Sequence, residues 1–238
     1  MDASGSVVAQ ATRPITTFQY EEDSRLYEQS AAQIWDAIAG CVREAVSAAH
    51  VEPEDVQGIG FDATCSLVVT ARDGSPVSVT PPSLADRAGR QRTSERNVIL
   101  WADHRAEEEA AQINSTGHKV LHYVGGTMSL EMETPKTLWL KRHLTPAEFD
   151  RAQFFDLPDY LTYRATDSTA RSNCSLVCKY GYIPPGVDGS ELGWQPDFLR
   201  QIGLGSVVGE DESFTPLGGV PCLLYNLRAH ETEADLVC

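Results

Sequence analysis

Several absences in the sequence narrow what this chain can be. No apolar run approaches the roughly 18 residues that a membrane-spanning helix needs, and Met1–Gly5 lacks the basic and apolar regions of a secretory signal peptide. Basic residues are scarce, since 19 Lys and Arg stand against 34 Asp and Glu and leave a net charge of −15. A nucleic-acid-binding protein needs a basic face. We therefore expect a cytoplasmic protein that binds neither nucleic acid nor membrane.

The cysteines are too few and too irregularly spaced to suggest a metal site. The six cysteines form no CxxC pair, and Cys174 and Cys178 have no histidine close to them in the sequence. A disulfide framework is not implied in a chain of 238 residues. We expect buried, reduced thiols and no bound metal.

The stretch Asn97–Arg105 is the most informative part of the chain. It opens with the apolar run Val98–Leu100, which predicts a short buried strand, and it ends in Trp101, Asp103 and Arg105. An Ala- and Glu-rich segment with high helix propensity follows immediately. Ligands of open α/β sheets bind outside the carboxyl ends of the strands, so these polar residues are candidate ligand-binding groups.

A structural reading of the same residues remains open. Asp103 could cap the following helix, and Arg105 could be its ion-pair partner on the surface. His104 and His122 show no partner in the sequence and receive no role, whereas Met128 is expected to pack in the core.

Hydrophobic periodicity predicts the other elements of an α/β fold. Ser30 and Gln33 have capping-box spacing at the start of the clearest helix, and Gly40 within it suggests close packing. Strands are expected at Ser6–Gln10, Ile15–Tyr20, Val56–Phe61, Ser66–Thr70, Gln153–Leu157 and, as a pair, within Ser172–Tyr182; helices at Ser30–His50, Thr134–His143, Thr145–Asp150, Pro158–Ala165 and the end of Gly193–Gly203.

Three loops separate these elements. Asp62–Cys65 has small side chains that would let a ligand approach the backbone, although these residues taken alone favour a tight turn within a hairpin. The glycine-rich segment Tyr123–Ser129 lacks the GKS or GKT of a Walker loop, and Pro81–Arg96 is expected to be a surface loop.

Taken together, these motifs resemble the FGGY carbohydrate kinases, and in particular their ribulokinase-like branch. Each stretch alone is a weak match, but five of them keep the order of the family. They are GIGFDATCSLVV (Gly58–Val69), NVILWADHRAEEEA (Asn97–Ala110), GGTMSLEMETPKTLWLKRHL (Gly125–Leu144), FFDLPDYLTYRATDSTARSNCSLVCKYGY (Phe154–Tyr182) and GWQPDFLRQIGL (Gly193–Leu204).

The resemblance implies a fold and an activity. The fold would be an incomplete ribonuclease-H-like α/β domain of the actin and hexokinase type, with a mixed sheet and flanking helices. Residues 1–205 would form part of the N-terminal, sugar-binding domain, and residues 206–238 an atypical tail. Family members transfer the γ-phosphoryl group of MgATP to a sugar hydroxyl, and the ribulokinase-like motif favours D-ribulose or a related ketopentose or polyol.

The resemblance also carries over substrate-binding residues, but no catalytic residue. Ala63 would line the sugar pocket, and Trp101 would pack on the apolar face of the sugar. Lys136 would reach the sugar, although a solvated helix lysine is the alternative. Asp159 would match an acidic family residue whose role could be structural. Asp103 and Arg105 would hold hydroxyls or shape the pocket.

Two family motifs are missing from the sequence. It contains no DxGT turn, which contacts the phosphates and metal in the family, and no IDAHAGG-like segment with the catalytic aspartate; Asp211 and Asp235 lie in unrelated contexts. We therefore expect a chain truncated at both ends, inactive alone, and unable to bind ATP and Mg²⁺ well. The alternative is a non-catalytic sugar-binding or regulatory remnant that forms a homo-oligomer or contacts a full-length kinase.

Overall fold

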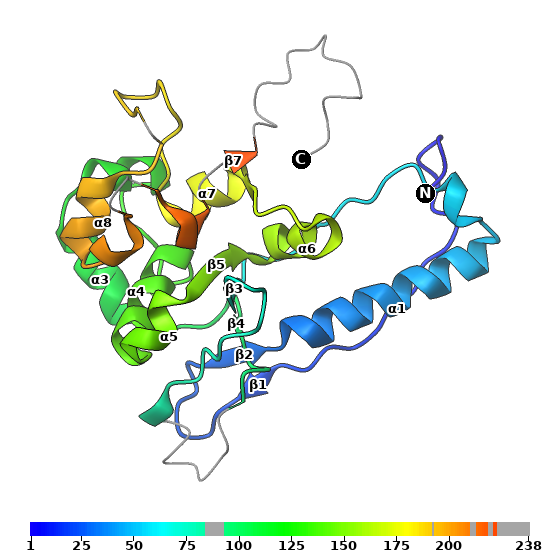
Figure 1. The fold of residues 1–238 in the computed structure, drawn as a ribbon, viewed down its shortest axis with the longest axis horizontal. Helices are drawn as coiled ribbons and strands as arrows, with labels where there is room; N and C mark the ends of the chain where they lie inside the picture. Colours follow the sequence, from blue (N-terminus) through cyan, green and yellow to red (C-terminus); the bar gives the residue numbers. More distant parts are fainter. Residues whose placement is uncertain (84–92, 192, 210–212, 219–220, 223–238) are drawn as a thin grey trace.

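A five-stranded sheet lies at the centre of the fold, with helices on both faces (Figure 1). The computed structural model describes residues 1–83, 93–191, 193–209, 213–218 and 221–222. The strand order is β1-β2-β4-β3-β5, and every neighbouring pair is antiparallel. The strands are β1 (Phe18–Gln19), β2 (Tyr27–Gln29), β3 (Leu67–Ala71), β4 (Val98–Ile99) and β5 (Ala152–Asp156).

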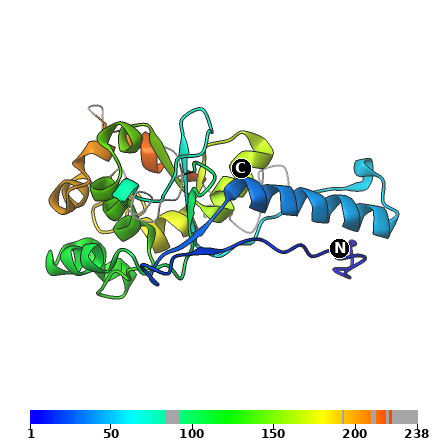
Figure 2. The ribbon, with the colours of Figure 1, turned by 90° about the horizontal axis from the view of Figure 1, so that it is seen from below.

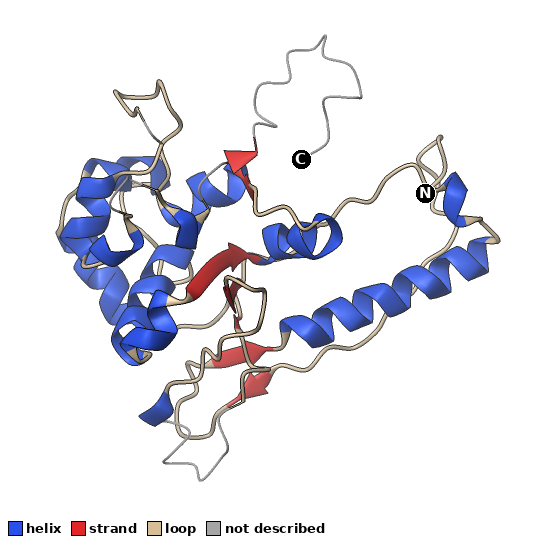
Figure 3. Ribbon diagram, viewed as in Figure 1, coloured by secondary structure: helices blue, strands red, loops and turns tan. Residues whose placement is uncertain are grey.

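A parallel pair occurs in a separate small sheet, which joins β6 (Arg171–Ser172) to β7 (Pro221–Cys222). The described main sheet is therefore antiparallel and not mixed as expected, and the described parallel pair belongs to the small sheet. The helices are α1 (Ala31–Ala49), α3 (Glu107–Ser115), α4 (Glu133–His143), α5 (Pro146–Asp150), α6 (Leu157–Thr166), α7 (Asn173–Tyr180) and α8 (Pro196–Ile202), as Figure 3 shows. The short 3-10 helices are η1 (Pro53–Asp55), η2 (Lys119–Val124), η3 (Gly205–Val207) and η4 (Thr215–Leu217).

The strand β3 is buried on both faces because helices cover the sheet on each side. Leu67 and Val69 belong to the larger apolar core, which includes residues of α3, α4, α7 and α8. Val68 points to the opposite side, into a smaller core with Ile34 of α1 and residues of α6. Alternation of side chains along a strand produces this division. The α/β expectation is confirmed, with the sheet sandwiched between helices.

The helix α1 begins and ends where the sequence predicts. Ser30 accepts a hydrogen bond from the backbone N–H of Gln33 at 3.3 Å. The capping box is incomplete, because the Gln33 side chain instead accepts a bond from the backbone N–H of Thr16 at 2.7 Å. The close packing expected at Gly40 is confirmed, since a Cβ there would lie 2.5 Å from Nε of Arg13.

Only the first turns of α1 pack into the core. The helix projects away from the sheet beside the extended N-terminal segment (Figure 2). Its later apolar residues, including Val42 and Val46, line a groove of about 680 Å³ with Val8 and Val56. The apolar stripe that predicted this helix is thus only partly covered by described residues.

Three strand predictions are wrong. Ser6–Gln10 and Val56–Phe61 are not strands, and Val7 and Ile59 are exposed. Both segments have strand-like composition, but neither has a described strand beside it to accept its main-chain hydrogen bonds. The strand pair expected within Ser172–Tyr182 is instead β6 followed by α7, which begins at the side-chain cap of Ser172.

The thiols are less buried than expected. Cys41 and Cys65 are half-buried, whereas Cys174 and Cys178 are exposed on successive turns of α7, and none of these four forms a disulfide. Within the described residues, no helix combines the length and apolar character required to cross a bilayer. Most of the predicted tail, including Asp211 and Asp235, lies outside the described residues, as does the middle of the loop Pro81–Arg96.

Candidate functional site

Beyond the end of β4, Trp101 is partly exposed and Asp103 is buried. The chain turns directly after the strand, where the backbone N–H of Asp103 donates to the carbonyl of Leu100 at 3.0 Å. This turn leaves 41% of Trp101 exposed, while Asp103 is completely buried. The residues that follow this strand therefore contribute both to the surface and to the interior.

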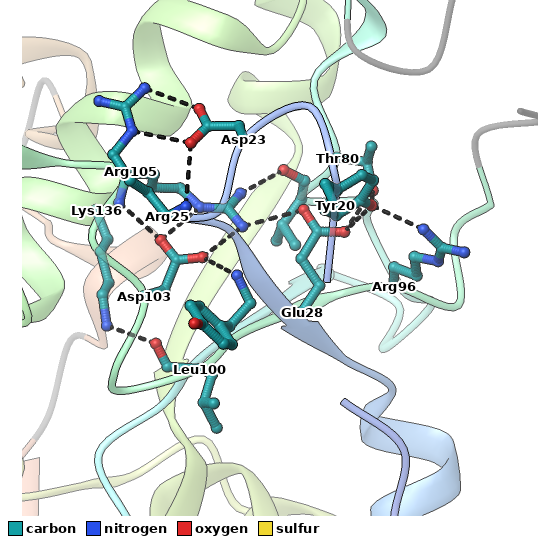
Figure 4. Close-up of polar contacts among 12 residues, drawn as sticks. Tyr20, Asp23, Arg25, Glu28, Thr80, Arg96, Leu100, Asp103, Arg105 and Lys136 are labelled. Carbon is teal, nitrogen blue, oxygen red and sulfur yellow. Dashed lines mark hydrogen bonds and ion pairs between the residues drawn. The ribbon is translucent and has the colours of Figure 1, made fainter. Parts of the chain in front are cut away.

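Asp103 and Arg105 form a buried ion pair that ties the segment after β4 to β2 and to the loop at Val79 (Figure 4). Asp103 accepts bonds from Nε and Nη2 of Arg105, both at 2.8 Å, and from the backbone N–H of Tyr27 at 2.6 Å. Arg105 also donates to Glu28 at 3.1 Å and to the carbonyl of Val79 at 3.0 Å. A bidentate, fully hydrogen-bonded geometry is what a buried charge pair requires.

The surroundings keep Arg105 charged. Burial alone lowers its pKa, but the carboxylates of Asp103 and Glu28 outweigh that effect and raise the pKa above its ordinary value. The guanidinium carbon also lies 4.8 Å from the ring centre of Trp139 on α4. Glu28 is held in turn by the hydroxyl of Tyr20 at 2.6 Å. The network therefore fixes the strand end against β2 and α4.

This network corrects the structural reading of these residues. Asp103 does not cap α3, whose N-cap is Ala106 without a side-chain bond. Arg105 is ion-paired as that reading supposed, but the pair is buried and not on the surface. Pocket shaping is therefore the better supported of the two roles expected for Asp103 and Arg105, because their hydrogen bonds are directed at each other and at the main chain.

Lys136 is fully buried, so the solvated-lysine alternative is wrong. Its Nζ donates to the carbonyl oxygens of Leu100 at 3.0 Å and Trp101 at 3.2 Å. Burial lowers the pKa of Lys136, and the negative charge of Glu133 opposes that shift. The structure thus places Lys136 against the Trp101 backbone, while 41% of Trp101 is exposed.

Other ionisable groups around Lys136 were not predicted from the sequence. Burial raises the pKa of Glu133 to about 8 and also raises the pKa of Asp156, while Lys179 lies close enough to lower both. The hydroxyl of Tyr180 lies in the same region, and its pKa is raised by burial and then by Glu133. The three-residue spacing between Glu133 and Lys136 at a helix start was the available signal, because it places both on one helix face.

Asp159 lies near Asp156 of this cluster, whereas Ala63 packs on the other side of the sheet. Ala63 is half-buried and packs against the smaller core, two residues before Cys65, whose charge affects the pKa of Lys136. Asp159 accepts a bond from the backbone N–H of Ser172 at 2.9 Å, which joins α6 to the start of α7. Burial raises the pKa of Asp159 to about 6, and its observed contact is structural.

A hollow of about 180 Å³ lies on the Arg105 side of the network. Asp23, Arg25, Trp139 and His143 line it, together with Arg105 and neighbouring loop residues. None of the other predicted substrate-binding residues reaches it. The predicted residues therefore do not all converge on this one hollow.

Smaller predictions are also resolved. Met128 is buried in the larger core and Met132 packs against it, so their predicted packing role is confirmed. His104 has a partner that the sequence did not show, since its Nε2 lies 3.2 Å from Glu131. In the described part of the chain, no group of three or more His, Cys, Asp and Glu side chains could hold a metal ion.

Two curated proteins resemble this chain over nearly its whole length. A D-ribulokinase of Saccharomyces cerevisiae is 46% identical over 219 residues, which cover 92% of the chain and 29% of that protein. The FGGY carbohydrate kinase domain-containing protein of Homo sapiens is 42% identical over 214 residues, or 90% of the chain and 35% of that protein. The chain belongs to the FGGY carbohydrate kinase family. It spans about a third of the length of these relatives.

Solved structures agree on the fold of this FGGY chain. The xylulose kinase of Rhodospirillum rubrum matches with a TM-score of 0.62 and 19% identity over 85% of this chain and 38% of that one. The glycerol kinase of Plasmodium falciparum, solved with ADP, matches with a TM-score of 0.57 and 14% identity over 87% of this chain and 42% of that one. No protein-family model matches the chain. The predicted actin and hexokinase-type fold is confirmed.

Proposed function

We propose that this FGGY chain forms the sugar-binding part of an ATP-dependent ketopentose kinase, with D-ribulose as its substrate. The buried Lys136 carries the proposal. Its ammonium is fixed by two main-chain carbonyls directly behind the exposed Trp101, which supports a cation ready to bind a hydroxyl beside an aromatic surface. The 46% identical relative is itself a D-ribulokinase.

The roles of the predicted residues follow from their contacts. Trp101 packs on the carbon chain of the sugar, and Lys136 donates to one of its hydroxyls. Asp103 and Arg105 hold the strand end that carries Trp101, while Ala63 leaves room for the sugar near Cys65. Binding depends on this preorganisation, because groups already fixed before the sugar arrives lose little entropy on binding.

The chain alone is proposed to bind sugar without transferring phosphate. Its sequence has no DxGT turn and no IDAHAGG-like segment. MgATP supplies the phosphoryl group and charge neutralisation in such kinases, and we assign no step of that chemistry to residues of this chain. A proton-accepting side chain and fixed charge stabilisation each contribute orders of magnitude to a rate.

Two assays separate these statements. We expect calorimetry to detect D-ribulose binding to the 238-residue chain, whereas a coupled ADP-release assay should show no turnover. Turnover at the rate of a complete kinase would contradict the proposed inactivity, and absence of binding to any ketopentose would refute the sugar-binding role. Binding without turnover, together with co-purification of a complete kinase, would favour the regulatory alternative.

Substitution of Trp101 tests the proposed aromatic contact. Because 41% of Trp101 is exposed, Trp101→Ala should leave the free energy of unfolding within about 1 kcal/mol of the original value. The affinity for D-ribulose should fall about tenfold or more, since an aromatic contact and its buried apolar area are lost. Calorimetry and urea denaturation measure the two effects, and an unchanged affinity would remove Trp101 from the site.

A further inference from the structure

Glu133 is a buried carboxyl group whose hydrogen-bonding capacity is unused. Its exposed fraction is 0%, and neither carboxyl oxygen has a hydrogen-bond partner among the described residues. Glu133 is the first residue of α4, whose N-cap Met132 supplies no side-chain bond. Buried polar atoms are nearly always bonded, so two orphaned oxygens on one side chain indicate that a partner is still to be supplied.

Lys136 also retains a free donor beside Glu133. An ammonium group has three N–H donors, and those of Lys136 have two described acceptors, the carbonyls of Leu100 and Trp101. Residues three apart on a helix lie on one face, and the charge of Glu133 raises the pKa of Lys136. An unused donor and an unused acceptor are therefore adjacent.

Tyr180 adds a third unsatisfied group from another helix. Its hydroxyl is buried without a hydrogen-bond partner among the described residues, and the nearby charge of Glu133 helps to raise its pKa. The helices that carry them are in contact, since the Thr134 hydroxyl donates to the carbonyl of Lys179 at 3.5 Å. Glu133 and Tyr180 thus lack hydrogen-bond partners among the described residues, in a region where Lys136 has one unused donor.

We propose that Glu133 is a further substrate-binding residue, which acts with Lys136 to recognise two adjacent hydroxyls of the sugar. One hydroxyl accepts a hydrogen bond from the free N–H of Lys136, and the neighbouring hydroxyl forms a hydrogen bond with the Glu133 carboxyl. The inference rests on the proposed function, since it takes the ligand of this site to be a ketopentose. Glu133 thereby makes the site selective for a vicinal diol over a deoxy sugar.

The protonation of Glu133 suits this role. Burial raises its pKa to about 8, with Lys136 lowering it and Asp156 raising it. At neutral pH the carboxyl is mostly protonated and offers both a donor and an acceptor to a hydroxyl. A site that pairs with a hydroxyl rejects an analogue without it strongly, because the buried polar group is then left unpaired.

A cycle of protein and ligand variants tests the assignment. Calorimetry on the 238-residue chain compares D-ribulose with its 3-deoxy and 4-deoxy analogues, for the original protein and for Glu133→Met. Loss of the hydroxyl that Glu133 recognises should weaken binding about tenfold or more in the original protein. In Glu133→Met the same loss should weaken binding less than about twofold. Glu133→Gln should restore most of the discrimination, since an amide also bonds to a hydroxyl.

Glu109→Met is the matched control. Glu109 on α3 is also buried, but one of its carboxyl oxygens is paired with Arg142 at 2.6 Å, so discrimination should match the original protein. Equal losses for the deoxy analogues in the original protein and in Glu133→Met would overturn the inference. If Glu133→Met does not fold, the carboxyl ¹³C resonances of the original protein provide the test. A glutamate resonance should shift when D-ribulose is added, and it should shift less with one of the two deoxy analogues. Absence of any such shift would overturn the inference.

The outcomes also separate this inference from the proposed function. Ketopentose binding that is indifferent to Glu133 would refute the inference and leave the proposed function intact. If ketopentoses do not bind but ribitol or another polyol binds with the same dependence on Glu133, the diol site stands and the ketopentose assignment falls. Absence of binding to every polyol tested would refute both.

Discussion

Replacing Arg105 with methionine should lower the free energy of unfolding by about 3–5 kcal/mol, the cost typical of breaking a buried charge pair. The substitution keeps much of the side-chain volume but leaves Asp103 and Glu28 as buried carboxylates without their cation. Urea denaturation at neutral pH measures the loss. The loss in the free energy of unfolding should be smaller at lower pH, because protonation neutralises the unpaired carboxylates.

Arg25→Met is the matched control for this prediction. Arg25 also pairs with an aspartate at 2.8 Å, but 51% of its side chain is exposed. Exposed ion pairs contribute about 0–1 kcal/mol, so this variant should unfold almost like the original protein. Equal losses for Arg105→Met and Arg25→Met would show that burial of the Arg105 network does not determine its stability.

Stability should fall as pH rises from about 4.5 to about 8, because of Glu133. Its pKa is raised by burial from 4.5 to about 8 in the folded chain. Between these values the folded protein holds a proton that the unfolded chain has released, so rising pH favours unfolding. This stabilisation is complete below the pKa of Glu133 in the unfolded chain and is lost above its pKa in the folded chain. Between the two values the free energy of unfolding falls by up to about 1.4 kcal/mol per pH unit.

Glu133→Gln isolates this effect from the other charges. An amide does not titrate, so urea denaturation of the variant at several pH values should give a flatter dependence, with the two proteins diverging most above pH ~8. Asp159, whose pKa is raised to about 6, contributes equally to both proteins over a lower range. Parallel curves for the two proteins would show that Glu133 does not hold its proton in the folded state.

Local sequence was enough to place most elements. Ser30 capped the helix that its spacing predicted, and the apolar run at Val98 formed a buried strand. Such features depend on neighbours within a few residues, so they can be inferred from the chain alone. The strand prediction at Val56–Phe61 is wrong because a strand also needs a partner strand, and composition does not specify whether one is present.

The candidate site was only partly predictable for the same reason. Lys136 was selected by its motif, but its burial depends on the distant carbonyls of Leu100 and Trp101. Glu133 was missed because a glutamate at a helix start ordinarily reads as a favourable surface charge near the positive end of the helix dipole. Its removal from water is a property of the packing of α4 against α7.

The sequence by itself determined the family, most of the helices, and the polar residues that follow β4, because each is encoded in short contiguous motifs. Tertiary structure alone decided which of those polar residues face each other. It buried Arg105 with Asp103 and Glu28, which lies 77 residues away in the chain, and it left Glu133 without a hydrogen-bond partner among the described residues. Burial and charge pairing arise from segments that meet only when the chain folds, so no local pattern records them.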